Sequence, residues 1–519
     1  MWYARFLSTD RLFFLALLWT VAAFSLTGCQ EHEPNSNRGV TVESFREFSK
    51  PGQTINSHHI RNFIDSLMGT DTDSTVADYH TRSYYLNNGR FLWIDRKGVD
   101  SRADTLLYWL RGVGEMGFST RSFCVENVEQ DLHSVRVLQL DNTHHGNVNA
   151  VLARLEYQLT KAYFRYVAGQ RFGFTNPSYL LNRIDMMEPS RYDSVQHPVC
   201  YRVLFDIPIE HASRDFFLTA IRKVEIDSLG AFLSAVQPRC EFFHALQKRL
   251  TGAQSDKNLR AKILCNMERC RWREKDPMQN HSKFVVINLP SKHLMAINHR
   301  DTLSMRIGFG SLKTKTPLLT SRIKRMEVNP QWVIPRSIID NDVAHHAGNR
   351  HYFDSHNFYV VDRKTGKSVD FSQVTSSMLR NHDYYVVQRG GKGNSLGRLI
   401  FRFDNDFSVF LHDTSSRSVF KREDRSVSHG CVRVEKPYEL GVFLMHEKNQ
   451  LLMDKLKYSM TADSFANRRM IVRNIKIEPQ VPLYITYFTL YPMAGGLMAE
   501  YADVYGFDRV IYSALRPYL

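Results

Sequence analysis

The spacing of apolar residues along the chain changes once, near residue 280, and this change limits the possible folds more than any other feature of the sequence. Before it, apolar residues recur at helical spacing, most clearly at Val151, Leu155, Leu159 and Tyr163. After Lys283, short β-type runs are separated by turn residues. The sequence therefore predicts an α+β multidomain chain, in which a mostly α-helical N-terminal scaffold precedes a mainly β C-terminal domain.

The same patterns predict where several elements begin and end. Asp256 is expected to cap a helix that continues through Met267. Ala168-Gly169 is expected to stop the helix that contains Val151. The expected strands of the second unit are 284–289, 294–298, 304–308, 358–361, 384–388, 399–403, 409–411 and 483–491.

The first thirty residues have the features of an export signal. Arg5 and Arg11 precede the apolar run 12–26, which has the length of a signal-peptide core and is shorter than the ~20 residues of a membrane-spanning helix. The tetrapeptide Leu26-Thr27-Gly28-Cys29 resembles a bacterial lipobox, in which the chain is cut before the Cys and the thiol is acylated. An uncleaved anchor helix is the alternative. Both interpretations place the protein in the cell envelope or periplasm, attached to a membrane.

Composition limits the function classes. The 68 Lys and Arg exceed the 53 Asp and Glu, which gives a formal net charge of +15. Such an excess is typical of nucleic-acid binding, but export removes DNA and RNA as expected partners. Seven Cys are too few for a scaffold built on disulfides, and the sequence alone predicts no pairing.

The chemistry of the chain is concentrated between His412 and Arg433. His412 ends a short expected strand, and Ser428-His429-Gly430-Cys431-Val432-Arg433 follows. A thiol acts as a nucleophile when a neighbouring imidazole or cation assists its deprotonation. Gly430 permits a tight turn before Cys431, so that main-chain N–H groups can face an oxyanion. These residues together predict acyl transfer, with Cys431 as the nucleophile.

Two assignments within this segment have alternatives. His412 is the expected base, oriented by Asp413 or by the Thr414 hydroxyl, and His429 competes with it because it lies two residues from the thiol. His429 is otherwise expected to place main-chain donors, with Gly430 and Cys431, around the oxyanion. The nearby imidazoles and Arg433 predict a thiol pKa below the ~8.5 of free Cys. Arg433 itself can bind a substrate carboxylate or pair with Glu435 or Glu439.

The pattern H-x15-S-H-G-C-V-R resembles the signature of L,D-transpeptidases with a YkuD-type catalytic domain. Segments 315–317, 328–335 and 388–397 are similar to other landmarks of that family, in the family's order. The helical half, including 155–177, resembles the scaffold domain of the large periplasmic YcbB-like subfamily, and the resemblance covers roughly residues 60–519. Two features differ: Gly390 stands where the family usually has Pro, and no peptidoglycan-binding repeat module is recognised.

The resemblance implies a function and further site residues. The expected activity is the formation of 3→3 peptidoglycan cross-links through a Cys431 thioester, with stem peptides as donor and acceptor and carbapenems as inhibitors. Ser428 joins the catalytic turn by resemblance, and Trp332, Asn394 and Gly397 join Arg433 in substrate binding. The alternatives are a hydrolase or amidase acting on the same peptides, and a non-catalytic wall-binding lipoprotein.

The resemblance also completes the expected domain order. The domains are expected to be a lipoprotein signal peptide (1–29), a polar tether (30–55), a helical scaffold (56–280) and a catalytic domain (281–519) with an inserted flap (340–383).

No cofactor or metal is expected. The turn around Gly390, Gly391 and Lys392 lacks the spacing of a phosphate-binding loop. Four imidazoles lie within twelve positions, but no Cys or clear carboxylate completes a zinc ligand set with them. These imidazoles belong to His345, His346, His351 and His356.

Overall fold

The structure, a computed structural model, describes residues 55–95, 98–137, 139–141, 144, 146–187, 199–299, 301–446, 449–461, 467–493 and 497–519. The expected signal peptide, the lipobox Cys29 and nearly all of the polar tether lie outside the described residues. Within the described residues, no helix combines the length and the apolar character needed to cross a membrane.

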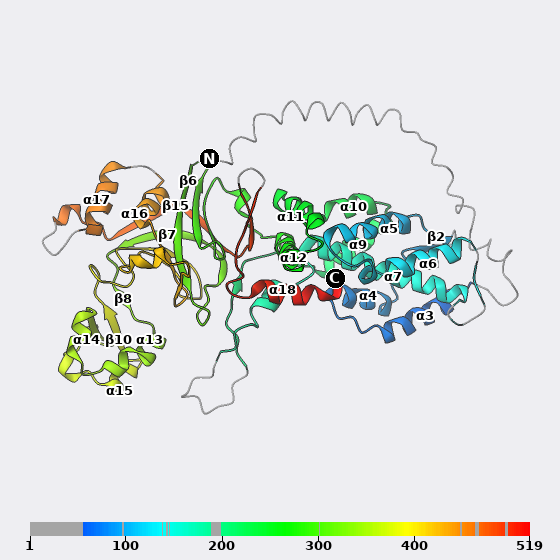
Figure 1. Ribbon diagram of the computed structural model, residues 1–519. Coiled ribbons are helices and arrows are strands. Elements are labelled where there is room, and N and C mark those ends of the chain that lie inside the picture. The colour runs from blue at the N-terminus through cyan, green and yellow to red at the C-terminus, as the bar shows by residue number, and fades with distance from the viewer. Residues whose placement is uncertain are drawn as a thin grey trace, which may run out of the picture.

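The N-terminal half is helical, as predicted (Figure 1). Its centre is α7 (Val148–Phe172), which is buried along almost its whole length and contacts α3, α4 and α6. The predicted cap is confirmed, because the Asp256 carboxylate accepts the N–H groups of Asn258 and Leu259 at the start of α12. The helices are α3 (Ser57–Thr70), α4 (Val76–Leu86), α5 (Arg102–Arg111), α6 (Val125–Arg136), α7, α8 (Pro177–Leu181), α9 (Arg214–Glu225), α10 (Leu229–Ala235), α11 (Glu241–Gly252) and α12 (Lys257–Arg271).

The predicted stop at Ala168-Gly169 is wrong, because α7 continues to Phe172 and ends at Gly173. Gly169 serves close packing instead: a Cβ at this position would lie 2.2 Å from the ring of Phe174. Gly173 has φ +96°, a conformation that favours glycine at a helix end.

The C-terminal half is built on a sheet of ten strands, in the order β11-β12-β14-β6-β5-β4-β15-β7-β3, with β13 paired to β6. A further pairing between β11 and β7 closes the strands from β11 to β7 into a ring, and β3 lies outside this ring at the edge of β7. The strands are β3 (Phe205–Asp206), β4 (Lys283–Asn288), β5 (His293–Asn298), β6 (Asp301–Gly310), β7 (Leu318–Val328), β11 (Leu399–Phe403), β12 (Leu411–His412), β13 (Ser426–Ser428), β14 (Val432–Val434) and β15 (Asn474–Thr486).

Two expected strands differ from the structure. The run 483–491 is the end of the longer β15 followed by the short β16 (Leu490–Pro492), which pairs with β17 (Met498–Glu500). The run 409–411 is β12, which begins only at Leu411. Strand β7 was not expected, because its buried Leu319, Ile323 and Met326 are four and three positions apart instead of two, with Arg and Lys side chains between them.

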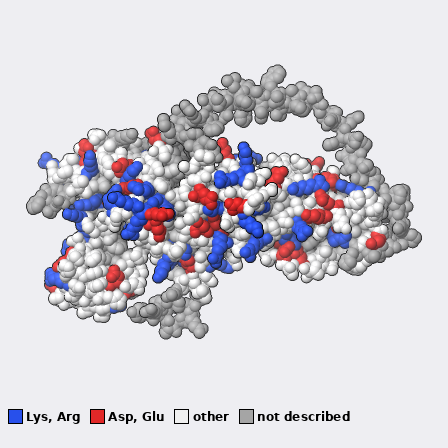
Figure 2. Space-filling view, viewed as in Figure 1, with Lys and Arg blue, Asp and Glu red and all other residues white. Residues whose placement is uncertain are grey.

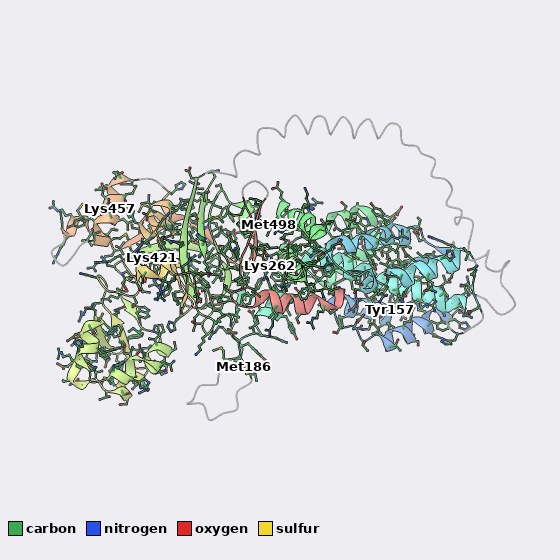
Figure 3. All side chains as sticks on the ribbon, viewed as in Figure 1. Tyr157, Met186, Lys262, Lys421, Lys457 and Met498 are labelled. Atoms are coloured by element: carbon green, nitrogen blue, oxygen red, sulfur yellow. The ribbon has the colours of Figure 1, made fainter. Side chains whose placement is uncertain are left out.

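The two halves are not separated cleanly at residue 280. Strand β3 of the helical half pairs with β7, and α18 (Phe507–Leu515) returns from the C-terminal half to pack on α8 and α12. Lys262 of α12 also pairs with Glu500 at 2.6 Å, at the junction marked by Lys262 and Met498 in Figure 3. The two halves therefore share one continuous apolar core.

A small subdomain with its own core lies apart from the sheet (Figure 1). Its three strands pair in the order β8-β10-β9, and its core reaches from Ile334 to Val386, so it is wider than the expected flap of 340–383. Its elements are β8 (Trp332–Val333), α13 (Arg336–Asn341), α14 (Arg350–Ser355), β9 (Phe358–Asp362), α15 (Ser376–Arg380) and β10 (Tyr384–Gln388). Two further helices, α16 (Pro437–Leu444) and α17 (Gln450–Thr461), lie between β14 and β15 in the chain.

Candidate active site

The register of two neighbouring strands places His412 and Cys431 on one face of the sheet. Strand β12 runs parallel to β14, with Leu411 opposite Val432 and His412 opposite Arg433. Side chains alternate between the two faces of a sheet, so Leu411 and Val432 enter the core while the other residues point to the opposite face. Continuing this register by one residue brings Cys431 beside Phe410, diagonal to His412. The N–H of Val432 donates to the Phe410 carbonyl at 3.1 Å, which supports this alignment.

His412 is buried, and its ring is oriented by a main-chain group. Nδ1 lies 2.5 Å from the carbonyl oxygen of Asp413, which can only accept, so the neutral ring carries its proton on Nδ1. Nε2 is then the basic nitrogen. Burial lowers the pKa of His412 to about 4, assisted by the charge of Arg433 and opposed by hydrogen bonds to the Asp413 and Leu396 carbonyls.

The group that orients His412 differs from the two that the sequence suggested. The Asp413 carboxylate accepts the N–H of Arg398 at 2.8 Å and pairs with Arg417 at 3.2 Å, so the residue acts on His412 through its carbonyl. The Thr414 hydroxyl accepts the N–H of Ser416.

Gly397 supports this arrangement sterically. Its φ is +66°, and a Cβ at this position would lie 2.5 Å from side-chain atoms of Asp413. Gly397 thus lets the chain pass close to Asp413, and its expected substrate contact stays a prediction.

Ser428 shapes the turn that carries the nucleophile. Its hydroxyl accepts the N–H of Gly430 at 3.1 Å and donates to the carbonyl of Cys431 at 2.5 Å. Gly430 has φ +116°, which favours glycine. The expectation that the Gly430 N–H faces an oxyanion is corrected, because Ser428 already accepts it.

The loop 311–316 holds the same turn from the other side. The Ser428 carbonyl accepts the Ser311 N–H at 3.0 Å and the Thr314 hydroxyl at 2.8 Å. The Gly430 carbonyl accepts the Thr316 hydroxyl at 2.9 Å. None of these loop residues was singled out in the sequence as a hydroxyl donor, because their partners are main-chain atoms more than a hundred positions away.

These contacts fix the direction of two main-chain N–H groups. A trans peptide unit is planar, so its N–H points away from its C=O. The loop donates hydrogen bonds to the carbonyls of Ser428 and Gly430. The N–H groups of His429 and Cys431, which belong to the same peptide units, therefore point away from the loop. In the part of the chain that the structure describes, neither N–H has an acceptor. The His429 side chain is exposed.

The Cys431 thiol is surrounded by cations, and it is nevertheless harder to ionise than a free thiol. Burial raises its pKa, and a hydrogen bond with the main chain of Phe410 and the charges of Arg402 and Arg433 oppose this only in part. The predicted depression of the thiol pKa is therefore contradicted. A raised thiol pKa and a lowered His412 pKa both favour a neutral thiol beside a neutral imidazole.

Arg433 lies near the thiol, and no carboxylate of the described residues pairs with it. Glu435 pairs instead with Arg306. The Nε of Arg433 is buried, and among the described residues it has no hydrogen-bond partner. This guanidinium is therefore available to a ligand that carries a carboxylate.

Two other expected substrate residues have structural roles. The buried Asn394 donates to the carbonyls of Arg389 and Pro330 and accepts the N–H of Leu396, so its predicted substrate contact is corrected. Trp332 is half-buried and packs against the core of the small subdomain.

Figure 2 shows Lys and Arg gathered over the C-terminal sheet beside a group of acidic side chains. Most of the basic residues of β6, β7 and the loop between them pair with carboxylates. The pairs are Arg306 with Glu435, Lys315 with Asp185, Arg322 with Asp276, Lys324 with Asp404 and Arg325 with Glu327.

The four flap imidazoles do not form a ligand cluster. His346 stacks on Tyr352 with ring centroids 3.9 Å apart, and His356 packs on the same ring at 4.3 Å. Within the described residues, no group of three or more His, Cys, Asp or Glu is placed to hold a metal ion.

Comparison with known proteins identifies two domains in the chain. Residues 282–444 match the family model of the L,D-transpeptidase catalytic domain, YkuD, and residues 79–250 match that of the Scaffold domain. A Haemophilus influenzae protein named "Putative L,D-transpeptidase" is 27% identical over 265 residues, which are 49% of this chain and 50% of that protein. The chain thus spans about half the length of this curated relative.

Among solved structures, an L,D-transpeptidase from Mycobacterium smegmatis matches at 12% identity with a TM-score of 0.17, over 40% of this chain and 58% of the other. The family matches confirm the resemblance seen in the sequence. The chain therefore contains a YkuD L,D-transpeptidase catalytic domain that follows a Scaffold domain, as in the YcbB-like architecture.

Proposed function

We propose that this protein forms 3→3 cross-links between peptidoglycan stem peptides through a thioester on Cys431. The observation that carries the proposal is the placement of His412 and Cys431 on one face of adjacent parallel strands, beside two main-chain N–H groups that find no acceptor among the described residues. This arrangement supplies a nucleophile, a base and oxyanion donors for acyl transfer.

The first half-reaction makes the thioester. Nε2 of His412 takes the proton of the Cys431 thiol while the sulfur attacks the carbonyl at the L-centre of diaminopimelate in a tetrapeptide stem. The N–H groups of His429 and Cys431 stabilise the oxyanion. The C–N bond to D-Ala then breaks, and the imidazolium returns the proton to the leaving amine.

The second half-reaction passes the acyl group to another stem. The side-chain amine of a second diaminopimelate attacks the thioester carbonyl and gives a proton to His412. The C–S bond breaks, and the thiolate of Cys431 recovers its proton. Water in place of the amine would give hydrolysis, so exclusion of water decides between transfer and trimming.

The protein is proposed to act in the cell envelope, attached through lipid on Cys29. The lipobox-like sequence supports the anchor, and the family of the catalytic domain supports the location. Carbapenems are expected to acylate Cys431, since an acyl-accepting thiol beside an oxyanion site can open a strained lactam ring.

Incubation with purified tetrapeptide muropeptides tests the proposed function. Mass spectrometry is expected to show 3→3 dimers together with released D-Ala. Trimmed monomers alone would identify a hydrolase and contradict cross-link formation. Absence of both products, with binding to sacculi retained, would indicate a wall-binding protein.

Arg433 is expected to bind a carboxylate of the stem peptide, because its charge lies near Cys431 and none of the carboxylates in the described ranges pairs with it. Losing a hydrogen bond to a charged group costs about 1.5–3 kcal/mol, so Arg433→Gln should raise KM by roughly 10- to 150-fold and change kcat less. Arg433→Lys should bring KM only part of the way back to the wild-type value, since Lys keeps the charge but cannot bind a carboxylate with two parallel hydrogen bonds. Arg325→Gln, which removes an exposed pair with Glu327, is the control. An unchanged KM in Arg433→Gln would exclude the carboxylate contact.

The low pKa of His412 predicts activity in mild acid. The base must be neutral to act, and its pKa of about 4 keeps it neutral well below the ~6.5 of an ordinary His. The acid limb of kcat/KM is therefore expected near pH 4. Between pH 6.5 and 4 the unfolded chain also binds a proton that the folded chain does not, so the free energy of unfolding should fall as pH falls. An acid limb at pH 6.5 would contradict the burial of the base.

A further inference from the structure

A hairpin from the scaffold domain reaches the catalytic half. Its two arms, 185–187 and 199–202, flank residues outside the described ranges, and we call them the scaffold hairpin. Met186 and Tyr201 form an antiparallel bridge, the Met187 N–H donates to the Cys200 carbonyl at 2.8 Å, and the Arg202 N–H donates to Asp185 at 2.9 Å. Met186, labelled in Figure 3, marks one arm. The arms therefore hold each other in register beyond α8.

The scaffold hairpin contacts the loop 311–316 at two points. Nζ of Lys315 lies 2.6 and 2.8 Å from the two carboxylate oxygens of Asp185. A guanidinium nitrogen of Arg202 donates to the carbonyl of Lys313 at 2.6 Å. Lys315 also donates to the Leu312 carbonyl at 3.0 Å, so one ammonium group joins the hairpin to the beginning of the loop.

The ion pair between Asp185 and Lys315 is shielded from water. The Lys315 side chain is 9% exposed and that of Asp185 19%. An ammonium group in such a place is stable only with a partner, because removing one member of a buried pair leaves a charge without compensation. Without Asp185, the Lys315 ammonium group would turn toward solvent and give up its hydrogen bond to the Leu312 carbonyl, which would loosen the loop.

A displacement of Lys315 would also displace Thr316, the next residue, which contacts the candidate active site. Thr316 donates its hydroxyl to the Gly430 carbonyl, and this carbonyl belongs to the same planar peptide unit as the Cys431 N–H. Thr314, on the other side of Lys315, holds the Ser428 carbonyl and thereby the His429 N–H. The residue that pairs with Asp185 thus lies between the two side chains that orient the oxyanion donors.

We propose that the scaffold hairpin positions the oxyanion donors of the catalytic domain, with Asp185 as the positioning residue. The inference rests on the proposed function and adds a role for the scaffold domain in catalysis. It requires that weakening the hairpin contact lowers the rate of acyl transfer, while the thiol itself and the binding of substrate change little.

The full-length protein and four variants test this inference. Asp185→Asn and Lys315→Gln each remove one charge, the double variant removes both, and Lys315→Arg keeps the charge. The matched control is Asp131→Asn: Asp131 pairs with Arg154 at 2.6 Å and its side chain is 9% exposed, but the pair lies between α6 and α7. The measurements are kcat and KM with muropeptides, the rate of alkylation of Cys431 located by peptide mapping, and the melting temperature.

Asp185→Asn and Lys315→Gln are each expected to lower kcat about 10- to 100-fold, because misplacing an oxyanion donor forfeits part of the ~10²–10³ that it supplies. KM and the alkylation rate, which need no oxyanion, should stay within about 3-fold. The double variant should lose no more than either single one, since both remove the same contact. Lys315→Arg should retain most of kcat, and Asp131→Asn should lose none.

Three results would overturn the inference. The first is an unchanged kcat in Asp185→Asn while the wild-type protein forms dimers. The second is an equal loss in Asp131→Asn, which would point to general destabilisation. The third is faster alkylation in step with the loss of kcat, which would indicate a collapsed turn. A wild-type protein that is alkylated at Cys431 but forms no acyl product would instead overturn the proposed function and this inference together.

Discussion

Cys431→Ala is expected to abolish cross-link formation and the release of D-Ala. Cys431 lies on the strand next to that of His412, near the charges of Arg402 and Arg433, and within the described part of the chain the N–H groups of residues 429 and 431 have no acceptor. Removing a nucleophile of this kind costs on the order of 10⁴-fold or more in kcat, and only binding and oxyanion stabilisation remain. Quantifying dimers and D-Ala after incubation with tetrapeptide muropeptides measures the loss.

Cys240→Ala is the control for thiol reactivity. The neighbouring Cys270 thiol lowers the pKa of Cys240 to about 7, so at neutral pH Cys240 ionises more readily than Cys431, whose pKa burial raises. If reactivity followed thiolate content alone, Cys240 would be the acylated residue. Full activity in Cys240→Ala and none in Cys431→Ala is expected, and the reverse would refute the assignment of the nucleophile.

His412→Asn is expected to lower kcat about 10³-fold or more. The raised pKa of Cys431 leaves little thiolate at neutral pH, so the reaction depends on a base that removes the proton as the sulfur attacks. Asn cannot accept that proton. Steady-state kinetics at pH 7 measures the change, and alkaline pH should restore part of the activity as the thiol ionises without help.

His429→Asn distinguishes the two candidate bases. The His429 side chain is exposed, and its contribution to the site is its main-chain N–H, which Asn retains. A loss below about 10-fold is therefore expected. A loss in His429→Asn that exceeds the loss in His412→Asn would assign the base to His429 and exclude the mechanism proposed above.

The sequence was informative where chemistry depends on residue type. Cys431, His412 and Arg433 were identified because a thiol, an imidazole and a guanidinium group close together in the sequence are typical of a nucleophilic site. The order of helical and β-rich halves also followed from periodicity. What brings the residues together is the parallel pairing of β12 with β14, a long-range register that no local pattern contains.

The sequence was less informative about individual atoms. Asn394, Gly397 and the N–H of Gly430 were assigned to substrate or oxyanion, but a motif does not show which hydrogen-bonding groups the fold itself uses. The carbonyl of Asp413 and the hydroxyl of Thr316 were missed for the converse reason, since their roles depend on main-chain partners.

Electrostatics could be predicted in part. Nearby cations were recognised around Cys431, and the structure includes both Arg402 and Arg433 among them. Burial is the larger influence on the thiol and on His412, and burial is a property of the folded sheet. The expected thiolate is therefore replaced by a neutral thiol that depends on His412.

The most direct test of the account is the site of acylation. The protein is incubated with a tetrapeptide stem lacking an acceptor amine, quenched in acid and mapped by mass spectrometry. The account predicts an acyl-tripeptide thioester on Cys431, with one D-Ala released for each modified chain and no adduct in Cys431→Ala. Release of D-Ala without an adduct on Cys431, or an adduct on another thiol, would contradict it.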